Sequence, residues 1–313
     1  MSKIAFLCSG QGAQRVGMAI DFAERFEAAD ELLELAGRAA HADIRALIEQ
    51  GPLEELSRTQ NTQPALVAVS LAIANELEER GVHPDCVAGF SLGEYAAHVI
   101  AKTLDVQTAL ELVSRRGAVM AMAADQHEGG MAALLRCDLA QAARLCRACA
   151  GEFGQVLAPS NVNCPGQVVI SGEKEALEAA CERWKGQGGK FAPVKTSGAF
   201  HCQLMEPAAR QMSRPLASVA FSEARIPLYC NYNALPLVHG NEAESLVRQI
   251  TSPVLWEDTI RNMIADGVDT FVECGPGKVL TGMAKRTARD MGAHVELVSV
   301  ATVEELEACN VRA

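Results

Sequence analysis

The sequence lacks the long apolar run that a membrane span needs. No stretch approaches ~18 uninterrupted apolar residues. The apolar segment 4–8 is followed by Gly10 and Gln11 before it reaches the length of a signal-peptide core. We therefore expect no membrane attachment and a cytoplasmic location.

The sequence also lacks an excess of basic residues. It has 28 lysines and arginines against 39 aspartates and glutamates, which gives a formal net charge of -11. Binding to a nucleic acid requires a basic surface that neutralises phosphates. Nucleic acid is thus not an expected partner, and any anionic ligand must meet a local cluster of cations.

The cysteines show no disulfide or metal-binding pattern. Their number is odd, at eleven, and most stand alone. Only Cys146 and Cys149 have a tight spacing, but no second pair accompanies them and they lie on a predicted helix. We expect reduced, buried thiols and no metal site.

Phosphate-binding motifs are incomplete. The loop Gly10-Gln11-Gly12 lacks the third glycine of a dinucleotide fingerprint, and the turn Gly275-Pro276-Gly277-Lys278 does not match a P-loop. We expect no bound ATP or NAD, and no other resident cofactor.

What is present is a regular alternation of strands and helices. A chain of 313 residues exceeds one typical core. Apolar periodicity predicts strands over 3–8, 86–90, 226–230, 270–274 and 294–300, and its clearest helices over 64–79, 106–122 and 204–221. This order predicts an α/β fold with a predominantly parallel sheet.

The pattern changes between residues 129 and 194. Predicted elements there are a strand 131–136, a helix 139–150, strands 155–162 and 167–171, a helix 174–185 and a strand 191–194. This βαββαβ order is that of a ferredoxin-like unit. We predict an inserted small domain over 129–195 and a large catalytic domain made of 1–128 and 196–313.

The most informative motif is Gly89-Phe90-Ser91-Leu92-Gly93, a G-x-S-x-G sequence between a predicted strand and a predicted helix. A sharp strand-to-helix turn exposes the serine, and the glycines remove the Cβ atoms that would block it. The following helix directs free N–H groups towards an oxyanion. Ser91 is the candidate nucleophile, with a chance Gly-Ser turn as the alternative.

A serine nucleophile needs a base. Of the seven histidines, His201 is favoured because it lies where the predicted small domain returns to the large one, and clefts form at such junctions. His98 would point away from the turn. An ordinary surface or core histidine remains the alternative for His201. The other histidines in polar or loop surroundings are His41, His83, His127 and His239.

A hydrolase-like triad would also need an acid between Ser91 and His201 in chain order. Asp105, Asp125 and Asp138 are available, but none follows a convincing strand end. The third member is therefore left open by the pattern.

Eight segments carry a family resemblance. They are 10–14 (GQGAQ), 62–66 (TQPAL), 91–95 (SLGEY), 115–120 (RRG with Met120), 161–167 (NVNCPGQ), 198–201 (GAFH), 249–256 (Gln249 with Pro253, Val254 and Trp256) and 275–280 (GPGKVL). In this order the chain resembles, along nearly its whole length, the malonyl-CoA:acyl carrier protein transacylases of fatty acid and polyketide synthesis. The implied fold is a hydrolase-like parallel-sheet core with an inserted ferredoxin-like small domain.

The resemblance implies a role for each catalytic position. Ser91 would be acylated, and His201 would act as general base and then as general acid. The backbone N–H groups of Gln11 and Leu92 would form the oxyanion hole, where losing one donor typically costs about 2.7–4 kcal/mol. The carbonyl of Gln249, rather than an aspartate, would orient the histidine.

The resemblance also implies the substrates. Arg116 would hold the malonyl carboxylate bidentately, and Gln63, Met120, Asn161 and Phe200 would complete the site. Phe200 is similar to the residue in members that prefer malonyl over methylmalonyl. Malonyl would pass from malonyl-CoA through a Ser91 ester to the phosphopantetheine thiol of holo acyl carrier protein, in a ping-pong reaction without a bound cofactor.

Two further expectations concern departures from the family pattern and the partner. Phe90 stands where the family commonly has a histidine, which leaves Ser91, His201 and Arg116 untouched. Acyl carrier proteins are commonly acidic, so we expect a basic rim near the cleft, made of Lys190, Lys195, Lys285, Arg286 and Arg289.

Two rival functions remain open. The first is an editing hydrolase of the same fold, which clears acyl chains from carrier proteins and has no need for Arg116. The second is a non-catalytic scaffold or carrier-docking module, which would tolerate the loss of Ser91 or His201.

Overall fold

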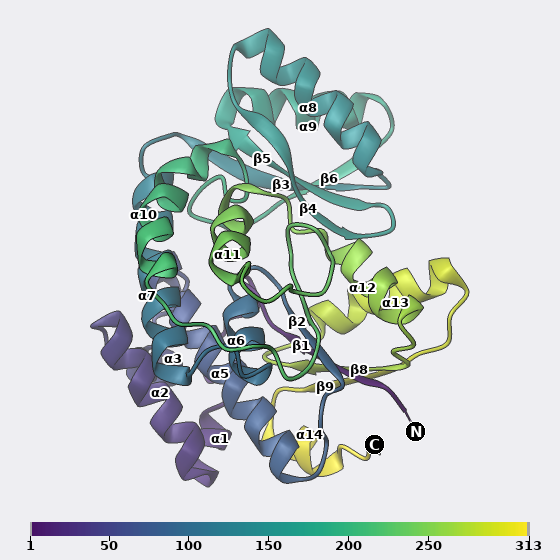
Figure 1. Cartoon of the computed structure of the whole chain (residues 1–313). Helices are drawn as coiled ribbons and strands as arrows, with labels where there is room; N and C mark the ends of the chain where they lie inside the picture. Colours follow the sequence, from purple (N-terminus) through teal and green to yellow (C-terminus); the bar gives the residue numbers. More distant parts are fainter. Residues whose placement is uncertain (1, 312–313) are drawn as a thin grey trace.

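The computed structural model describes residues 2–311 and contains two β-sheets (Figure 1). The larger sheet has the order β7-β2-β1-β8-β9, and all of its neighbouring strands are parallel. Its strands are β1 (Ile4–Cys8), β2 (Cys86–Gly89), β7 (Leu228–Tyr229), β8 (Thr270–Cys274) and β9 (Glu296–Val300). This confirms the predicted α/β class with a parallel sheet.

Helices cover both faces of this sheet, because alternate side chains of each central strand enter different cores. Ile4, Phe6 and Cys8 of β1 belong to one core, whereas Ala5 and Leu7 belong to the other. Helices of the first core are α1 (Ile20–Arg25), α2 (Glu27–Ala40), α3 (Ile44–Gln50), α4 (Leu53–Leu56), α5 (Thr59–Glu79), α6 (Gly93–Ile100), α7 (Val106–Ala124), α10 (Glu206–Ala217), α11 (Glu242–Thr251) and α14 (Val303–Ala308). The second core contains α12 (Trp256–Ala265) and α13 (Val279–Met291).

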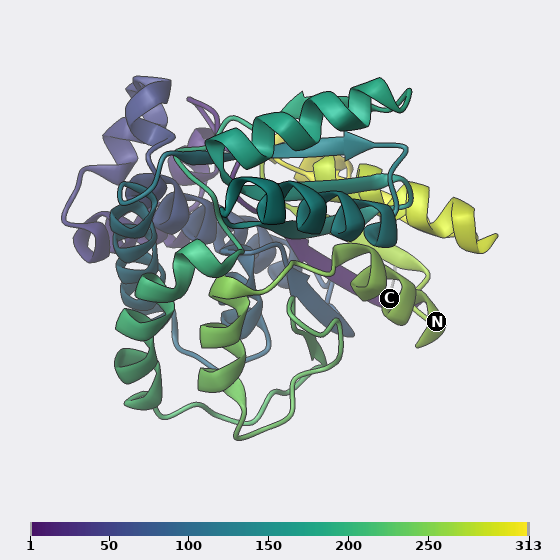
Figure 2. The same ribbon diagram turned by 90° about the horizontal axis from the view of Figure 1, so that it is seen from above.

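The smaller sheet is antiparallel and has the order β4-β5-β3-β6. Its unit runs through β3 (Gly129–Leu135), α8 (Leu139–Phe153), β4 (Leu157–Cys164), β5 (Gln167–Glu173), α9 (Lys174–Gly186) and β6 (Lys190–Pro193). Both helices pack on one face of this sheet (Figures 1 and 2). The connectivity is that of a ferredoxin-like unit. The limits of the two domains stay a prediction.

Two backbone hydrogen bonds join the small sheet to the part of the chain around the parallel sheet. The N–H of Val162 on β4 donates to the carbonyl of Val254 at 2.9 Å, and the N–H of Val254 donates to the carbonyl of Ser160 at 2.9 Å. This parallel bridge ties the edge of the small sheet to the segment that precedes α12.

Several predicted boundaries were wrong. The helix predicted over 64–79 begins earlier, at Thr59, because the turn before Pro64 is packed into the core. The helix predicted over 204–221 is a short 3₁₀ turn, η1 (Gln203–Met205), followed by α10, which ends at Ala217. The chain then extends so that Ser222 and Arg225 donate to the carbonyls of Thr103 and Ala101. The strand predicted over 226–230 shortens to the edge strand β7.

The cysteines are free thiols, and most of them are buried. All eleven cysteines are free, and Cys146 and Cys149 are buried in the core of the small sheet. Burial raises the pKa of Cys146 to about 12. Across residues 2–311, no three His, Cys, Asp or Glu side chains gather as metal ligands would. No helix in that range is long and apolar enough to cross a bilayer.

Candidate active site

Ser91 lies on a strained turn between β2 and α6. Its φ is 53°, in the left-handed region that non-glycine residues rarely adopt. A Cβ on Gly89 would lie 1.9 Å from the carbonyl carbon of Gly93, and a Cβ on Gly93 would lie 2.5 Å from the carbonyl oxygen of Cys8. Only glycine fits at these two positions, so the turn has the geometry expected of a nucleophile elbow.

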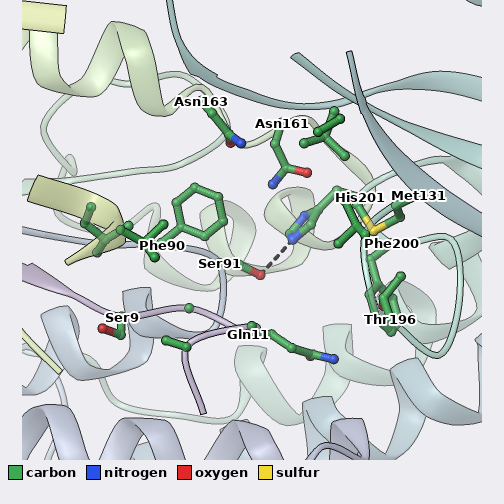
Figure 3. Close-up of a pocket in the computed structure, with 18 of the residues that line it drawn as sticks. Ser9, Gln11, Phe90, Ser91, Met131, Asn161, Asn163, Thr196, Phe200 and His201 are labelled. Carbon is green, nitrogen blue, oxygen red and sulfur yellow. Dashed lines mark hydrogen bonds between the residues drawn. The ribbon is translucent and has the colours of Figure 1, made fainter. Parts of the chain in front are cut away.

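His201 contacts Ser91 directly. Its Nε2 lies 2.7 Å from Ser91 Oγ (Figure 3), and its Nδ1 lies 2.9 Å from the carbonyl oxygen of Gln249. A carbonyl can only accept a hydrogen bond, so Nδ1 carries the imidazole proton and Nε2 is free to accept from the serine. Burial and the nearby Arg116 lower the pKa of His201 to about 4. The imidazole is therefore neutral at pH 7 and able to take a proton.

None of the three candidate acids reaches this pair. Asp105 accepts from the N–H of Thr108 at the start of α7, and Asp138 caps α8 in the same way. Asp125 is exposed at the end of α7. The Gln249 carbonyl occupies the position that an aspartate would have in a hydrolase triad.

The remaining histidines lie elsewhere. His98 is buried on α6, where its Nδ1 contacts Thr103 Oγ1 at 2.6 Å rather than the serine. The exposed ones are His41, His83, His127, His239 and His294.

Arg116 projects from α7 into the site and has no exposed surface, unlike its neighbour Arg115. Its Nη2 lies 3.2 Å from Ser91 Oγ and 2.7 Å from Gln249 Oε1, and its Nη1 donates to Gln63 Oε1 at 2.8 Å. Its Nε–H has no partner within residues 2–311. These contacts fix the guanidinium beside the nucleophile.

A cavity of about 260 Å³ opens over Ser91 between the two sheets (Figure 3). The parallel-sheet region, which is the parallel sheet with its helices and loops, contributes Gln11, Gln63, Met120 and Phe200. The small sheet contributes Asn161 from β4. The structure thus brings the predicted substrate-contacting side chains together around one space, with Arg116 buried behind Ser91 and Gln63.

The predicted oxyanion donors are available. The backbone N–H groups of Gln11 and Leu92 donate no hydrogen bond to the protein within residues 2–311. Gln11 is held by its side chain, which donates to Thr59 Oγ1 at 3.2 Å, and Leu92 is the N-cap residue of α6. Phe90 lines the same cavity, and its ring packs edge-on against Trp256 at 5.3 Å between centroids.

Two buried residues that support the turn were missed by the sequence analysis. Asn231 accepts from the N–H of Ser91 at 2.7 Å and donates to the carbonyl of Gly89 at 2.7 Å. Glu94 accepts from the side chain of Gln249 at 2.8 Å. The available signals were a polar residue just after the predicted strand 226–230, and an acidic residue in an otherwise apolar helix.

The geometry agrees with comparisons to known proteins. A family model described as an acyl transferase domain matches residues 5–310. The chain belongs to the acyl transferase family. It is 40% identical over 309 residues to the malonyl CoA-acyl carrier protein transacylase of Bacillus subtilis strain 168, covering 98% of this chain and 96% of that protein. Over 289 residues it is 42% identical to the enzyme of that name from Escherichia coli K12, covering 91% and 93%.

Solved structures of this acyl transferase family agree as well. The malonyl CoA-acyl carrier protein transacylase from Clostridium perfringens superimposes with a TM-score of 0.91 at 34% identity and covers 98% of this chain and 96% of that one. A structure of a type II PKS acyl-carrier protein in complex with its malonyl-transacylase has a TM-score of 0.92 at 36% identity and covers 98% of both chains. The resemblance predicted from sequence is confirmed.

Proposed function

We propose that this acyl transferase moves a malonyl group from malonyl-CoA to the phosphopantetheine thiol of holo acyl carrier protein, as an [acyl-carrier-protein] S-malonyltransferase. The observation that carries the proposal is the contact of Ser91 Oγ with both His201 Nε2 and Arg116 Nη2. A base and a fixed cation for the substrate's carboxylate thus meet at one nucleophile. The relatives named above support the same substrates.

The first half-reaction forms a malonyl ester on Ser91. His201 Nε2 takes the hydroxyl proton as Oγ attacks the thioester carbonyl. The N–H groups of Gln11 and Leu92 stabilise the tetrahedral oxyanion. The C–S bond then breaks, and the departing coenzyme A sulfur takes the proton from the imidazolium.

The second half-reaction runs the same steps in reverse on a new thiol. The carrier's phosphopantetheine thiol gives its proton to His201 and attacks the ester carbonyl. The C–O bond breaks, and Ser91 Oγ recovers the proton. Gln249 holds the imidazole in one tautomer in both directions through its carbonyl. All steps use side chains and backbone groups, with no resident cofactor or metal.

The acyl preference follows from Arg116 and Phe200. A charge-assisted bond to the malonyl carboxylate contributes about 1.5–3 kcal/mol, which an acetyl group cannot gain. Phe200 is buried beside His201 and lines the cavity. Exclusion of one extra methyl group is worth only about 1–3 kcal/mol, so the preference for malonyl over methylmalonyl is graded.

The carrier protein would approach the basic rim. All five rim residues are exposed, and Lys195 also lines the cavity. Arg286 donates to the carbonyl of Pro165, in the turn between β4 and β5, at 2.9 Å. Reversing the charge of Lys195 and Arg286 together should slow transfer to an acidic carrier and leave loading from malonyl-CoA in place. Unchanged transfer would remove the rim from the proposal.

We place the reaction in the cytoplasm, which cell fractionation can test.

Intact-protein mass spectrometry tests the proposed reaction. The wild-type protein and its Arg116→Ala variant are mixed separately with malonyl-CoA and with acetyl-CoA, and holo carrier protein is then added. We expect a malonyl adduct on the protein that moves to the carrier. Acetyl loading that is independent of Arg116, followed by release to water, would instead identify the editing hydrolase. No adduct and no turnover would favour the scaffold.

A further inference from the structure

Glu94 is a buried acid for which the proposed reaction has no use. It lies in the first turn of α6, three residues after Ser91, and has no exposed surface. Its Oε2 accepts two hydrogen bonds, from the backbone N–H of Asn231 at 3.1 Å and from Gln249 Nε2 at 2.8 Å. Its Oε1 has no partner within residues 2–311. A buried carboxyl group so close to the nucleophile calls for a physical reason.

The hydrogen bond from Gln249 connects Glu94 to Arg116. The amide of Gln249 donates through Nε2 to Glu94, and it accepts through Oε1 from Arg116 Nη2 at 2.7 Å. An amide can flip its oxygen and nitrogen ends. The flipped orientation would point the amide N–H groups at the guanidinium. The acceptor at Glu94 Oε2, together with the Ser91 carbonyl, therefore selects the orientation that presents an oxygen to Arg116.

The hydrogen bond from Asn231 connects Glu94 to the strained turn at Ser91. Asn231 donates its backbone N–H to Glu94, while its side chain holds both the N–H of Ser91 and the carbonyl of Gly89. Gln249 Nε2 also donates to the Ser91 carbonyl at 2.9 Å. Glu94 Oε2 thus contacts both Asn231, which holds the Ser91 turn, and Gln249, which holds Arg116.

We propose that Glu94 is a positioning residue that fixes the Gln249 amide and, through it, the Arg116 guanidinium in the orientation that receives the malonyl carboxylate. This inference rests on the proposed malonyl transfer. The acceptor oxygen, rather than the negative charge, does the positioning. Burial raises the pKa of Glu94 to about 7, opposed by the bonds from Gln249 and Asn231 and by Arg116. A proton on the unpartnered Oε1 leaves Oε2 free to accept.

The rival explanation is that Glu94 only fills the core. Both explanations predict a loss of stability when the side chain is shortened or made apolar. They differ in substrate selectivity, because only the positioning role acts through Arg116, and Arg116 favours malonyl over acetyl. They also differ in whether the effects of substituting Glu94 and Gln249 add. Residues that act through one another give non-additive effects, so only the positioning role predicts non-additivity of this pair in selectivity.

The test compares Glu94→Leu, Glu94→Gln, Gln249→Leu and the double variant Glu94→Leu/Gln249→Leu. Initial rates of loading are measured for malonyl-CoA and acetyl-CoA, and the melting temperature is recorded for each protein. Glutamine keeps an acceptor at the Oε2 position, whereas leucine removes it at similar volume. Wild-type loading, measured alongside, reports on the proposed function independently of Glu94.

We expect Glu94→Leu to lower the malonyl-to-acetyl selectivity by roughly tenfold, as loss of a hydrogen bond to a charged group does. Glu94→Gln should stay within about threefold of the wild-type selectivity, and the double variant should be no less selective than Gln249→Leu. Equal losses for both substrates, or effects of the two single variants that multiply, would overturn the inference. If Glu94→Leu fails to fold, Glu94→Gln decides alone, since a tenfold loss of selectivity in that variant is also incompatible with an acceptor role.

Discussion

The parallel-sheet region and the small antiparallel sheet contribute differently to the cavity. Ser91, His201 and Arg116 all come from the parallel-sheet region, and each is held by at least two hydrogen bonds to buried partners. The small sheet contributes the polar side chains of Asn161, Asn163 and Gln167 and the apolar side chains of Met131, Ala133 and Val169. One region therefore fixes the proposed reacting atoms and the other closes the space above them. Substitutions of Ser91 and His201 in the first should change kcat, and those in the second should change KM.

The largest expected effect is that of Ser91→Ala. Removal of Oγ leaves no atom to form the ester, so we expect no malonyl adduct in intact-mass measurements and a loss of turnover beyond about a thousandfold. The melting temperature should stay close to that of wild type, because the substitution keeps the backbone. An acylated variant would show that another residue is the nucleophile.

Arg116→Ala should follow in size. It removes the donor for the malonyl carboxylate, and a loss of about 1.5–3 kcal/mol corresponds to roughly a tenfold to hundredfold lower kcat/KM for malonyl-CoA. Acetyl loading should change less. The matched control is Arg115→Ala on the same helix, since Arg115 is exposed. Equal losses for the two acyl groups would contradict a carboxylate-binding role.

Gly93→Ala tests whether the parallel-sheet region holds the turn by close packing. The added Cβ would lie 2.5 Å from the carbonyl oxygen of Cys8, and overpacking of this kind typically costs about 1–3 kcal/mol. Chemical denaturation should show a lower free energy of unfolding. Gly282→Ala on α13 is the control, because its Cβ would meet no atom within 4 Å. We expect that variant to be as stable as wild type or slightly more stable.

The pH dependence separates His201 from an ordinary histidine. An imidazole with the usual pKa, about 6.5, would be mostly protonated at pH 5 and unable to act as a base. Since burial and Arg116 lower the pKa of His201 to about 4, the rate of malonyl loading should change little between pH 7 and pH 5 and fall below that. A half-maximal rate near pH 6.5, in protein that circular dichroism shows to be folded, would contradict this.

The sequence singled out the proposed reacting residues but not the residues that hold them. Ser91 lies in a local G-x-S-x-G motif and His201 at a predicted domain junction, whereas Arg116 was indicated by the family resemblance carried by short sequence segments. Asn231 and Glu94 contact each other only because β7 pairs with β2 in the folded sheet. Their hydrogen bonds span 137 to 155 positions in the chain, and no local pattern encodes such contacts.

The same reasoning explains the boundary errors in the fold. The ferredoxin-like unit was predictable because its strands and helices have strong periodicity and short connections. The end of α10 was not, because the following chain is held by carbonyls of residues 101 and 103. Burial of α5 on all sides from Thr62 to Ala74 likewise removed the one-sided pattern from which its first turn could have been recognised.

Asn161→Ala should give the smallest effect and tests the small sheet's side of the comparison. Asn161 accepts from Ser160 Oγ at 3.0 Å, and its amide points into the cavity near His201 (Figure 3). Loss of one neutral hydrogen bond is worth about 0.5–1.5 kcal/mol, so KM for malonyl-CoA should rise about twofold to tenfold while kcat changes little. Asn233→Ala, outside the cavity, is the matched control. A fall in kcat with unchanged KM would place Asn161 among the groups that act on the transition state, and the division of roles between the two sheets would then be wrong.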